Sequence, residues 1–147
     1  MKNECFALKG ALTAQLFKAD GTVQTVQKNN MIVNVGFDFV ANSIGLATNR
    51  PGVMSVIAVG TGTTAVAAAQ TALTTQLAYK AAAYAHTSST KVFTFTTTFN
   101  PGEATGGITE AGVFNGNGGI MFDRVVFSVI NKGADDTLKV TFTFTMS

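Results

Sequence analysis

The alternation of side chains near the end of the chain constrains the fold more than any other feature. From Leu138 to Met146 every second residue is apolar, and the residues between them are one lysine and three threonines. Successive side chains of a β-strand point to opposite faces, so this period of two predicts a strand with one buried and one solvent-facing side. A chain that carries such a strand must cover its apolar face with a second layer.

The forty residues that end in this strand predict two further strands. Ile108–Asn115 and Ile120–Ile130 are rich in apolar residues and are separated by a turn of glycine and asparagine. A polar turn at 131–136 then leads to the final strand, Thr137–Met146. Three consecutive strands joined by short turns predict a β-meander whose middle strand is covered on both faces.

Two charged residues are predicted to meet in the first hairpin of this segment. If its turn is centred on Asn117, Glu110 lies across from Arg124. Such a pair neutralises two charges on an otherwise apolar hairpin, although it is worth only about 0–1 kcal/mol where it is exposed to water. The spacing therefore predicts an ion pair between the two strands.

Two other hairpins are predicted earlier in the chain. Ala11–Lys18 and Thr22–Lys28 flank an Asp-Gly pair, whose residues tolerate the positive φ of a tight turn. The faces of this hairpin are mixed, so its register stays open. Ala78–His86 and Lys91–Phe99 flank a turn of threonine and serine. Both segments have the composition of paired strands.

A two-residue loop in the second of these hairpins would fix its cross-strand pairs. Tyr84 would then lie opposite Phe93, and Ala82 opposite Phe95. Large aromatic side chains would share one face, and the threonines between the phenylalanines would face outward.

The best candidate for a helix is the segment Asn34–Leu46. Asn34 can cap its first turn, apolar residues follow at helical spacing, and Pro51 lies beyond its end. Because apolar residues occupy two neighbouring stripes, we expect most of its circumference to be covered. Met54–Val59 is predicted to be a short buried strand, and Thr63–Leu77 to be mostly loop.

These elements define the predicted fold class. Seven or eight strands, with turn signals about every 8–12 residues, predict a mainly β protein: an antiparallel β-sandwich or a jelly-roll-like barrel with one helix at about 34–46. A length of 147 residues suits one domain. We therefore expect a single β domain over 1–147, with an N-terminal arm at 1–9.

The composition limits the partners of such a domain. Charged residues make up 12% of the chain, about half the usual share, while 46% of residues are apolar. A surface with so little charge favours assembly with protein partners, the alternative being a monomer with a Thr, Ser, Asn and Gln surface. The net charge is only +2 and no basic cluster exists, so nucleic acid is not an expected partner.

No segment suggests a membrane or a secretory pathway. No run approaches the roughly 20 apolar residues that cross a bilayer, and the first ten residues make a poor signal peptide. The single cysteine, Cys5, allows no disulfide within the chain. We expect synthesis in the cytoplasm.

The reactive side chains of the sequence predict no catalytic, cofactor-binding or metal-binding residue. His86 is the only histidine, and neither Cys5 nor any serine has a nucleophile motif around it. Glu103 and Glu110 are the nearest approach to a pair of catalytic acids, but the chain has no tryptophan to form a sugar platform. The sequence therefore predicts that the protein is not an enzyme and needs no cofactor.

Two loops have a superficial likeness to ligand sites. The glycine-rich stretch at 60–64 lacks the Gly-Lys-Ser/Thr ending of a phosphate loop, so it is better explained as a turn at a strand end. Asp135 and Asp136 have no ladder of further acidic residues, whereas calcium takes six or more oxygen ligands. We interpret this pair as a solvated turn.

Three stretches of the chain carry patterns of glycines and alternating apolar residues: ITEAGVFN at 108–115, GIMFDRVVF at 119–127 and DTLKVTF at 136–142. These stretches resemble small structural proteins of tailed bacteriophages. IAVGTGT at 57–63, followed by TALT at 71–74, resembles the stretch that precedes them in that group. The likeness spans roughly residues 55–145. The shared patterns are glycines and alternating apolar residues, so they assign no functional residue.

The resemblance implies a component of the virion. One placement is a capsid cement (decoration) protein, bound between major capsid proteins and to copies of itself, with a trimer as one arrangement. The other is a tail-fibre, baseplate or neck component, which includes a module that binds a carbohydrate of the host surface. The compact size and the lack of repeats favour the cement protein. The expected contact elements are Met1–Lys9 and the loops Thr61–Leu77 and Asn100–Gly107.

Overall fold

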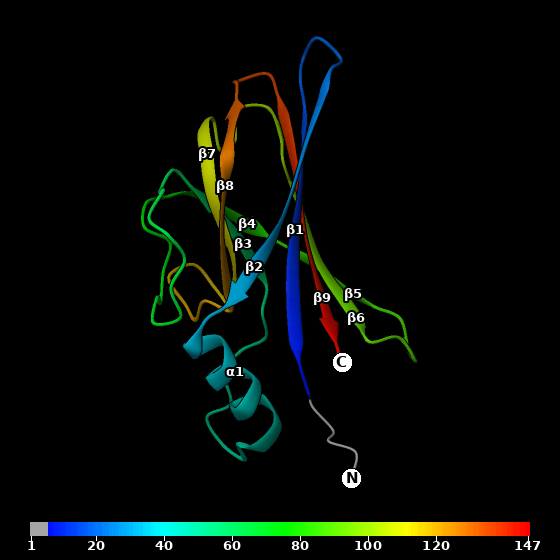
Figure 1. Cartoon of the computed structure of the whole chain (residues 1–147), viewed down its shortest axis with the longest axis vertical. Helices are drawn as coiled ribbons and strands as arrows, with labels where there is room; N and C mark the ends of the chain where they lie inside the picture. The colour runs from blue at the N-terminus through cyan, green and yellow to red at the C-terminus, as the bar shows by residue number, and fades with distance from the viewer. Residues whose placement is uncertain (1–5) are drawn as a thin grey trace.

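The computed structural model describes residues 6–147, which form two antiparallel sheets packed as a sandwich, with one helix at one end (Figure 1). The sheets are not closed into a barrel. The mainly β prediction is confirmed in its sandwich form. The elements in chain order are β1 (Leu8–Phe17), β2 (Val23–Ile32), α1 (Asn34–Gly45), β3 (Val56–Gly60), β4 (Gln76–Ala81), β5 (Ala83–His86), β6 (Val92–Phe99), β7 (Gly106–Phe114), β8 (Asp123–Lys132) and β9 (Thr137–Met146).

The two sheets are joined along one side by a short pairing. One sheet has the order β2-β1-β9-β6-β5 and the other the order β4-β3-β7-β8. β2 and β8 share two residue pairs, Met31 with Arg124 and Ile32 with Asp123. On the other side the chain passes from β4 to β5 through Ala82 and so changes sheet. Strands that bend from one sheet to the other are the usual way to close the corner of a sandwich.

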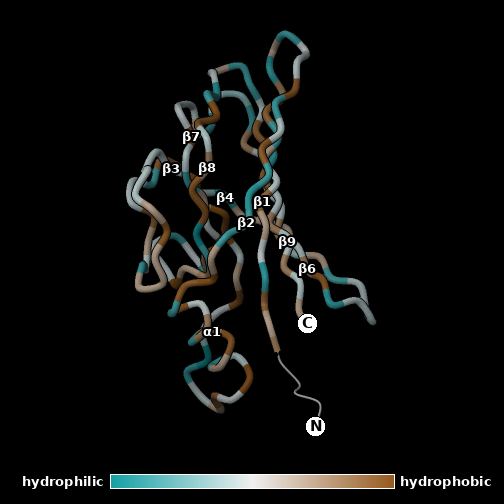
Figure 2. Tube along the Cα trace, viewed as in Figure 1, coloured by the Kyte–Doolittle hydropathy of each residue, from teal (hydrophilic) through white to brown (hydrophobic). Residues whose placement is uncertain are grey.

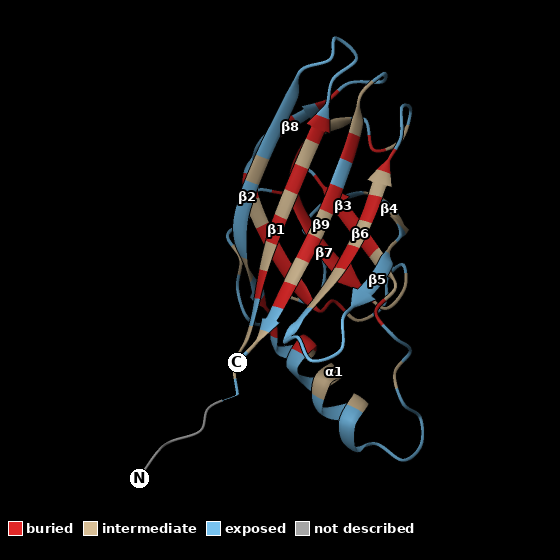
Figure 3. Ribbon diagram, turned by 90° about the vertical axis from the view of Figure 1, so that its right-hand side faces the viewer, coloured by how far each residue is buried: buried red, intermediate tan, exposed pale blue. Residues whose placement is uncertain are grey.

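The core lies between the inner faces of the two sheets. Burial alternates along β1 and β9, as the red and tan bands in Figure 3 show. Leu138, Val140, Phe142 and Phe144 are almost completely buried, which confirms the alternation predicted for the final strand. The hairpin of β1 and β2 around Asp20-Gly21 is confirmed as well, with Gly21 at a φ of 91°.

The predicted β-meander is wrong in its last step. β7 and β8 do pair, but β9 crosses to the other sheet and lies between β1 and β6. β9 pairs with β1 from Leu138 opposite Leu16 to Phe144 opposite Gly10. β9 is therefore a central strand of the β2-β1-β9-β6-β5 sheet, and its apolar face is buried against the opposite sheet.

The second hairpin forms with a different register from the predicted one. Tyr84 lies opposite Phe95, and His86 lies opposite Phe93. A longer loop moves the pairing by two residues, which keeps every side chain on its predicted face because the strand period is two. The predicted strand Ala78–His86 is also divided, since its first half, β4, pairs with β3 rather than with β6.

The helix is found where the sequence predicts it, but it is far less covered. Gly36 is the only buried residue of α1, because the rest of the fold packs against only one side of the helix. Asn34 does not cap the helix: Val33 is the N-cap residue, and the backbone N–H of Asn34 donates to the carbonyl of Ala68 at 2.8 Å. Apolar residues therefore remain on the outer surface at this end of the molecule (Figure 2).

Candidate functional site: an apolar pocket beside the helix

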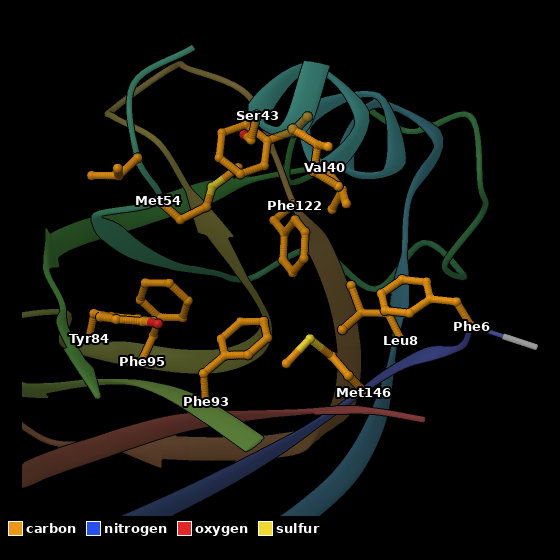
Figure 4. Close-up of a pocket in the computed structure, with 13 residues that line it drawn as sticks. Phe6, Leu8, Val40, Ser43, Met54, Tyr84, Phe93, Phe95, Phe122 and Met146 are labelled. Atoms are coloured by element: carbon orange, nitrogen blue, oxygen red, sulfur yellow. The ribbon is translucent and has the colours of Figure 1, made fainter. Parts of the chain in front are cut away.

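An apolar pocket of about 540 Å³ opens between α1 and the end of the β2-β1-β9-β6-β5 sheet (Figure 4). Its walls come from six parts of the fold: the start of the described chain, α1, the segment before β3, the β5–β6 hairpin, the start of β8 and the end of β9. The lining residues are Phe6, Leu8, Phe39, Val40, Ser43, Ile44, Val53, Met54, Tyr84, Phe93, Phe95, Phe122 and Met146.

The floor of the pocket is held by packed aromatic rings. The rings of Phe93 and Phe144 are stacked with centroids 5.1 Å apart, and Phe122 meets Phe144 edge to face at 5.0 Å. Tyr84 and Phe95 lie 5.5 Å apart on the neighbouring strands β5 and β6. These separations are in the range of favourable aromatic pairs, so the rings stabilise one another's positions.

The rim of the pocket is formed by large apolar side chains that face water. Ile44 is 82% exposed, Val53 78%, Phe6 68% and Tyr84 61%. Single exposed apolar residues are common on protein surfaces, but four that converge on one concavity from four different segments form a patch. Such patches mark sites where other molecules bind.

The chemistry of the lining is that of a binding site. Among the described residues that form it, the only polar side-chain groups are the hydroxyls of Ser43 and Tyr84. A pocket of this kind attracts apolar groups by removing their surface from water, at about 25 cal/mol for each Å². It suits one or more apolar side chains of a partner.

The sequence predicted none of this site. Its lining residues are far apart in the chain, and no local motif unites them. Only two signals pointed to it: the excess of apolar residues around the predicted helix, and the aromatic face of the second hairpin. Neither of these signals showed that the two elements meet.

A second feature is a buried ion pair between Glu110 and Arg124. The two side chains are fully buried, and Arg124 Nη2 lies 2.7 Å from Glu110 Oε2. The sequence predicted this pair with Glu110 directly across from Arg124. The ion pair does form, but the predicted register is wrong by two residues, because Glu110 lies opposite Val126. An ion pair on the surface would be exposed to water, but here the loop between β3 and β4 covers both charges. A weak surface interaction therefore becomes a buried polar network.

This network fastens the loop at 61–75 to the β4-β3-β7-β8 sheet. Arg124 donates to the carbonyl of Thr64 at 2.9 Å, to Oε1 of Gln70 at 3.0 Å and to Oγ1 of Thr74 at 2.9 Å. Glu110 accepts from the backbone N–H groups of Thr74 at 3.2 Å and Thr75 at 2.9 Å. Most of the loop that was expected as a free contact element is therefore held by the chain itself.

The glycine-rich stretch at 60–64 serves the same network. A Cβ atom on Gly60 or Gly62 would overlap the carboxyl group of Glu110, so these positions leave room for it. The hydroxyl of Thr109 donates to the carbonyl of Gly62 at 2.8 Å. The likeness to a phosphate loop thus has a structural basis, since the loop surrounds a carboxylate of its own chain.

The other described residues considered as reactive groups do not line the pocket. His86 ends β5, is exposed, and its Nδ1 lies 2.7 Å from the carbonyl oxygen of Val92. Lys80 donates to Glu103 at 2.6 Å, and this hydrogen bond holds the pKa of the Glu103 carboxyl below its usual range. Asp136 accepts from the backbone N–H of Gly133 at 2.8 Å, which lowers its pKa in the same way. Cys5 lies outside the described residues.

A buried acid that was not predicted lies at the junction of the two sheets. Asp123 is fully buried at the start of β8, where it accepts from the backbone N–H of Val113 at 3.0 Å and from the amide of Asn30. Burial away from water raises the pKa of Asp123 well above its usual value. Its only signal was an acidic residue beside an apolar run.

Neither a metal site nor a membrane span emerges from the described part of the chain. Within residues 6–147, no three His, Cys, Asp or Glu side chains gather where they could hold a metal ion. The described helix is too short to cross a bilayer.

Comparison with protein-family models, curated proteins and solved structures found no match to this chain. By its structure, the protein is a β-sandwich with an apolar pocket at one end.

Proposed function

We propose that this chain is a structural protein of a tailed-phage virion, and that it acts as a capsid cement protein. In this role it binds between major capsid subunits and to copies of itself, and so stabilises the head. The observation that carries the proposal is the uncharged apolar pocket with its four exposed rim residues, presented by a rigid sandwich. The resemblance of residues 55–145 to small phage structural proteins supports the same role.

The mechanism is mechanical rather than chemical. Each bound copy adds buried interface between neighbouring subunits, and a standard interface removes about 1,600 Å² from water. Because the shell is symmetric, every copy repeats the same contact, and the gains accumulate over the particle. The pocket rim would supply the buried apolar centre of one interface, and the N-terminal segment Met1–Lys9, which includes the rim residue Phe6, is a candidate for its edge. The loop Asn100–Gly107 lies at the opposite end of the sandwich, where β6 ends and β9 begins, so it is a candidate for a contact with a different subunit.

The alternative is a tail-fibre, baseplate or neck component that binds a host-surface carbohydrate. Specific ligand sites combine an apolar wall with several precisely placed polar groups. The pocket offers only the hydroxyls of Ser43 and Tyr84 on its otherwise apolar wall. This lining suits protein side chains better than a hydroxyl-rich sugar, so the cement protein is favoured.

Electron microscopy of the particle that carries the protein tests this proposal. An icosahedral head shell bound at its symmetric contact points would carry on the order of hundreds of copies. A tail or neck location would instead give about a dozen copies or fewer at one vertex, and would replace the cement protein with the alternative. Absence from the particle would contradict both placements.

A further inference from the structure

One edge of the β2-β1-β9-β6-β5 sheet is left open at β5. The last hydrogen bond on this side of the strand runs from the N–H of Ala82 to the carbonyl of Ser55, at 2.9 Å. Beyond it, the residues of β5 pair only with β6 on their other side, and the sheet order ends at β5. In the described chain, the backbone groups on the outer edge of β5 therefore face water.

This edge has only one of the usual protections against pairing with another strand, its short length. Many natural edge strands also carry lysines, prolines, inward charges or bulges that prevent such pairing. β5 has the sequence Ala-Tyr-Ala-His, and its register with β6 is free of bulges. Its four residues are all exposed. A strand this short can form only a few hydrogen bonds, so a stable partner needs additional contacts beside it.

The pocket lies next to this edge and can supply those contacts. Tyr84 belongs to β5 and also lines the pocket, and its partner on β6, Phe95, lines the pocket too. A strand added to β5 would therefore direct alternate side chains toward the pocket mouth. Strand addition gains affinity from main-chain hydrogen bonds and specificity from pockets for alternate side chains.

The rim and the pocket together present both protruding apolar side chains and a cavity that can receive such side chains from another molecule. Ile44 and Val53 project from the rim, and the concavity lies directly beside them. A two-fold interface uses one surface on both partners, so that surface must be complementary to itself. Identical patches also carry identical charge and repel each other if they are charged. The described lining residues bear no formal charge, so two copies can approach.

We propose that the occupant of this surface is a second copy of the chain, bound by antiparallel pairing of β5 with β5 about a two-fold axis. Directly opposed residues must point to the same face, so Tyr84 lies opposite the Tyr84 or the His86 of the other copy. The two pockets then lie side by side on one face, and the exposed rim residues of each copy cover the pocket of the other. The edge strand and the apolar patch are buried together.

This inference refines the proposed function by naming one partner of the protein. The presence of the dimer on a head shell rests on the proposed function, whereas the pairing of β5 with β5 does not depend on it. A protein that dimerises through β5 but is missing from the particle would contradict only the virion role. A protein found on the head shell that stays monomeric in solution would contradict only the dimer.

Sedimentation velocity over a wide range of concentration tests the dimer with variants of exposed residues. The variant Ala83→Lys/Ala85→Lys places like charges opposite each other across the pairing, and we expect its dissociation constant to rise about tenfold or more. The variant Ile44→Glu/Val53→Glu should do the same by charging the rim. Val23→Glu is the matched control, because Val23 is 53% exposed. Val23 begins β2 next to the β1–β2 turn, and this turn lies at the opposite end of the molecule from α1 (Figure 1).

A charge-swap experiment identifies the partner strand. Mixing the Ala83→Lys/Ala85→Lys variant with Ala83→Glu/Ala85→Glu places opposite charges across the pairing, and should restore dimers that neither variant forms alone. Circular dichroism checks that each variant is folded. A monomeric wild type at all concentrations overturns the proposal, and so does self-association that the β5 and rim variants leave unchanged. Pairing of β5 only with a different particle protein would overturn it as well.

Discussion

Replacing Arg124 with methionine should destabilise the protein more than most single substitutions. The guanidinium group is fully buried and makes four hydrogen bonds, one of them to the carboxylate of Glu110. The variant leaves that carboxylate buried without its counter-charge, and breaking a buried pair on one side costs about 3–5 kcal/mol. In a domain of this size, such a loss lowers the melting temperature by roughly 6–20 °C.

A double-mutant cycle separates the free energy of the charge pair from that of the hydrogen bonds that hold the loop at 61–75. Glu110→Leu combined with Arg124→Met removes both charges, so the remaining cost comes mainly from the backbone N–H groups of Thr74 and Thr75, which lose their acceptor. Each unpaired buried donor costs about 1–3 kcal/mol. We therefore expect the double variant to be clearly more stable than the sum of the two single effects predicts.

Urea unfolding of the four proteins at neutral pH measures these free energies directly. Lys80→Met is the matched control, because it breaks an ion pair whose side chains are 33% and 43% exposed. That variant should lose no more than about 1 kcal/mol. If Arg124→Met lost as little as this control, or if the two substitutions were simply additive, the argument for a coupled buried pair would fail.

Three further predictions concern the core, a glycine and the buried acid. Phe144→Ala should cost about 3–5 kcal/mol in urea unfolding, since Phe144 is fully buried among other rings. Gly60→Ala should cost about 1–3 kcal/mol, because the new methyl group overlaps Glu110 and the carbonyl of Thr75, whereas Gly52→Ala, with open space around it, should stay within about 0.5 kcal/mol of wild type. Asp123 has a raised pKa in the folded protein, so folding binds its proton and the stability it contributes is lost as pH rises. The unfolding free energy of wild type minus that of Asp123→Asn should therefore fall from about pH 3.8 upward and level off above the raised pKa, and a difference that rises with pH would contradict the assignment.

Local patterns predicted the strands well because burial and backbone geometry act on neighbouring residues. The final strand is the clearest case: its alternating residues could be assigned to faces from the sequence alone, and Leu138 and Phe144 are buried as predicted. The partners of that strand could not be assigned. Pairing of β9 with β1 joins residues more than a hundred positions apart, and no local pattern records such a contact.

The buried ion pair shows the same limit in a single interaction. Hairpin spacing predicted that Glu110 and Arg124 meet across two strands, and their side chains do form a contact, although the strands pair with a register shifted by two residues. Their burial depends on a third segment, the loop at 61–75, whose alanine and threonine content gave no indication of where it would lie. The sequence could therefore predict that the pair exists, but the strength of the pair follows from tertiary packing.

The exposure of apolar residues on α1, which differs from the prediction, bears on the function. A segment as apolar as α1 should be covered on most sides, yet Phe37 is 51% and Ile44 is 82% exposed. Exposed apolar residues on a helix weaken the agreement between sequence and structure, and such disagreements concentrate at functional sites. The exposed residue Ile44 lies on the rim of the same pocket that adjoins the open edge of β5. One bound partner would cover both Ile44 and this edge. Phe37 lies on a different surface, beside Asn29 and Ile32, so such a partner would supply only part of the burial that the sequence of α1 predicts.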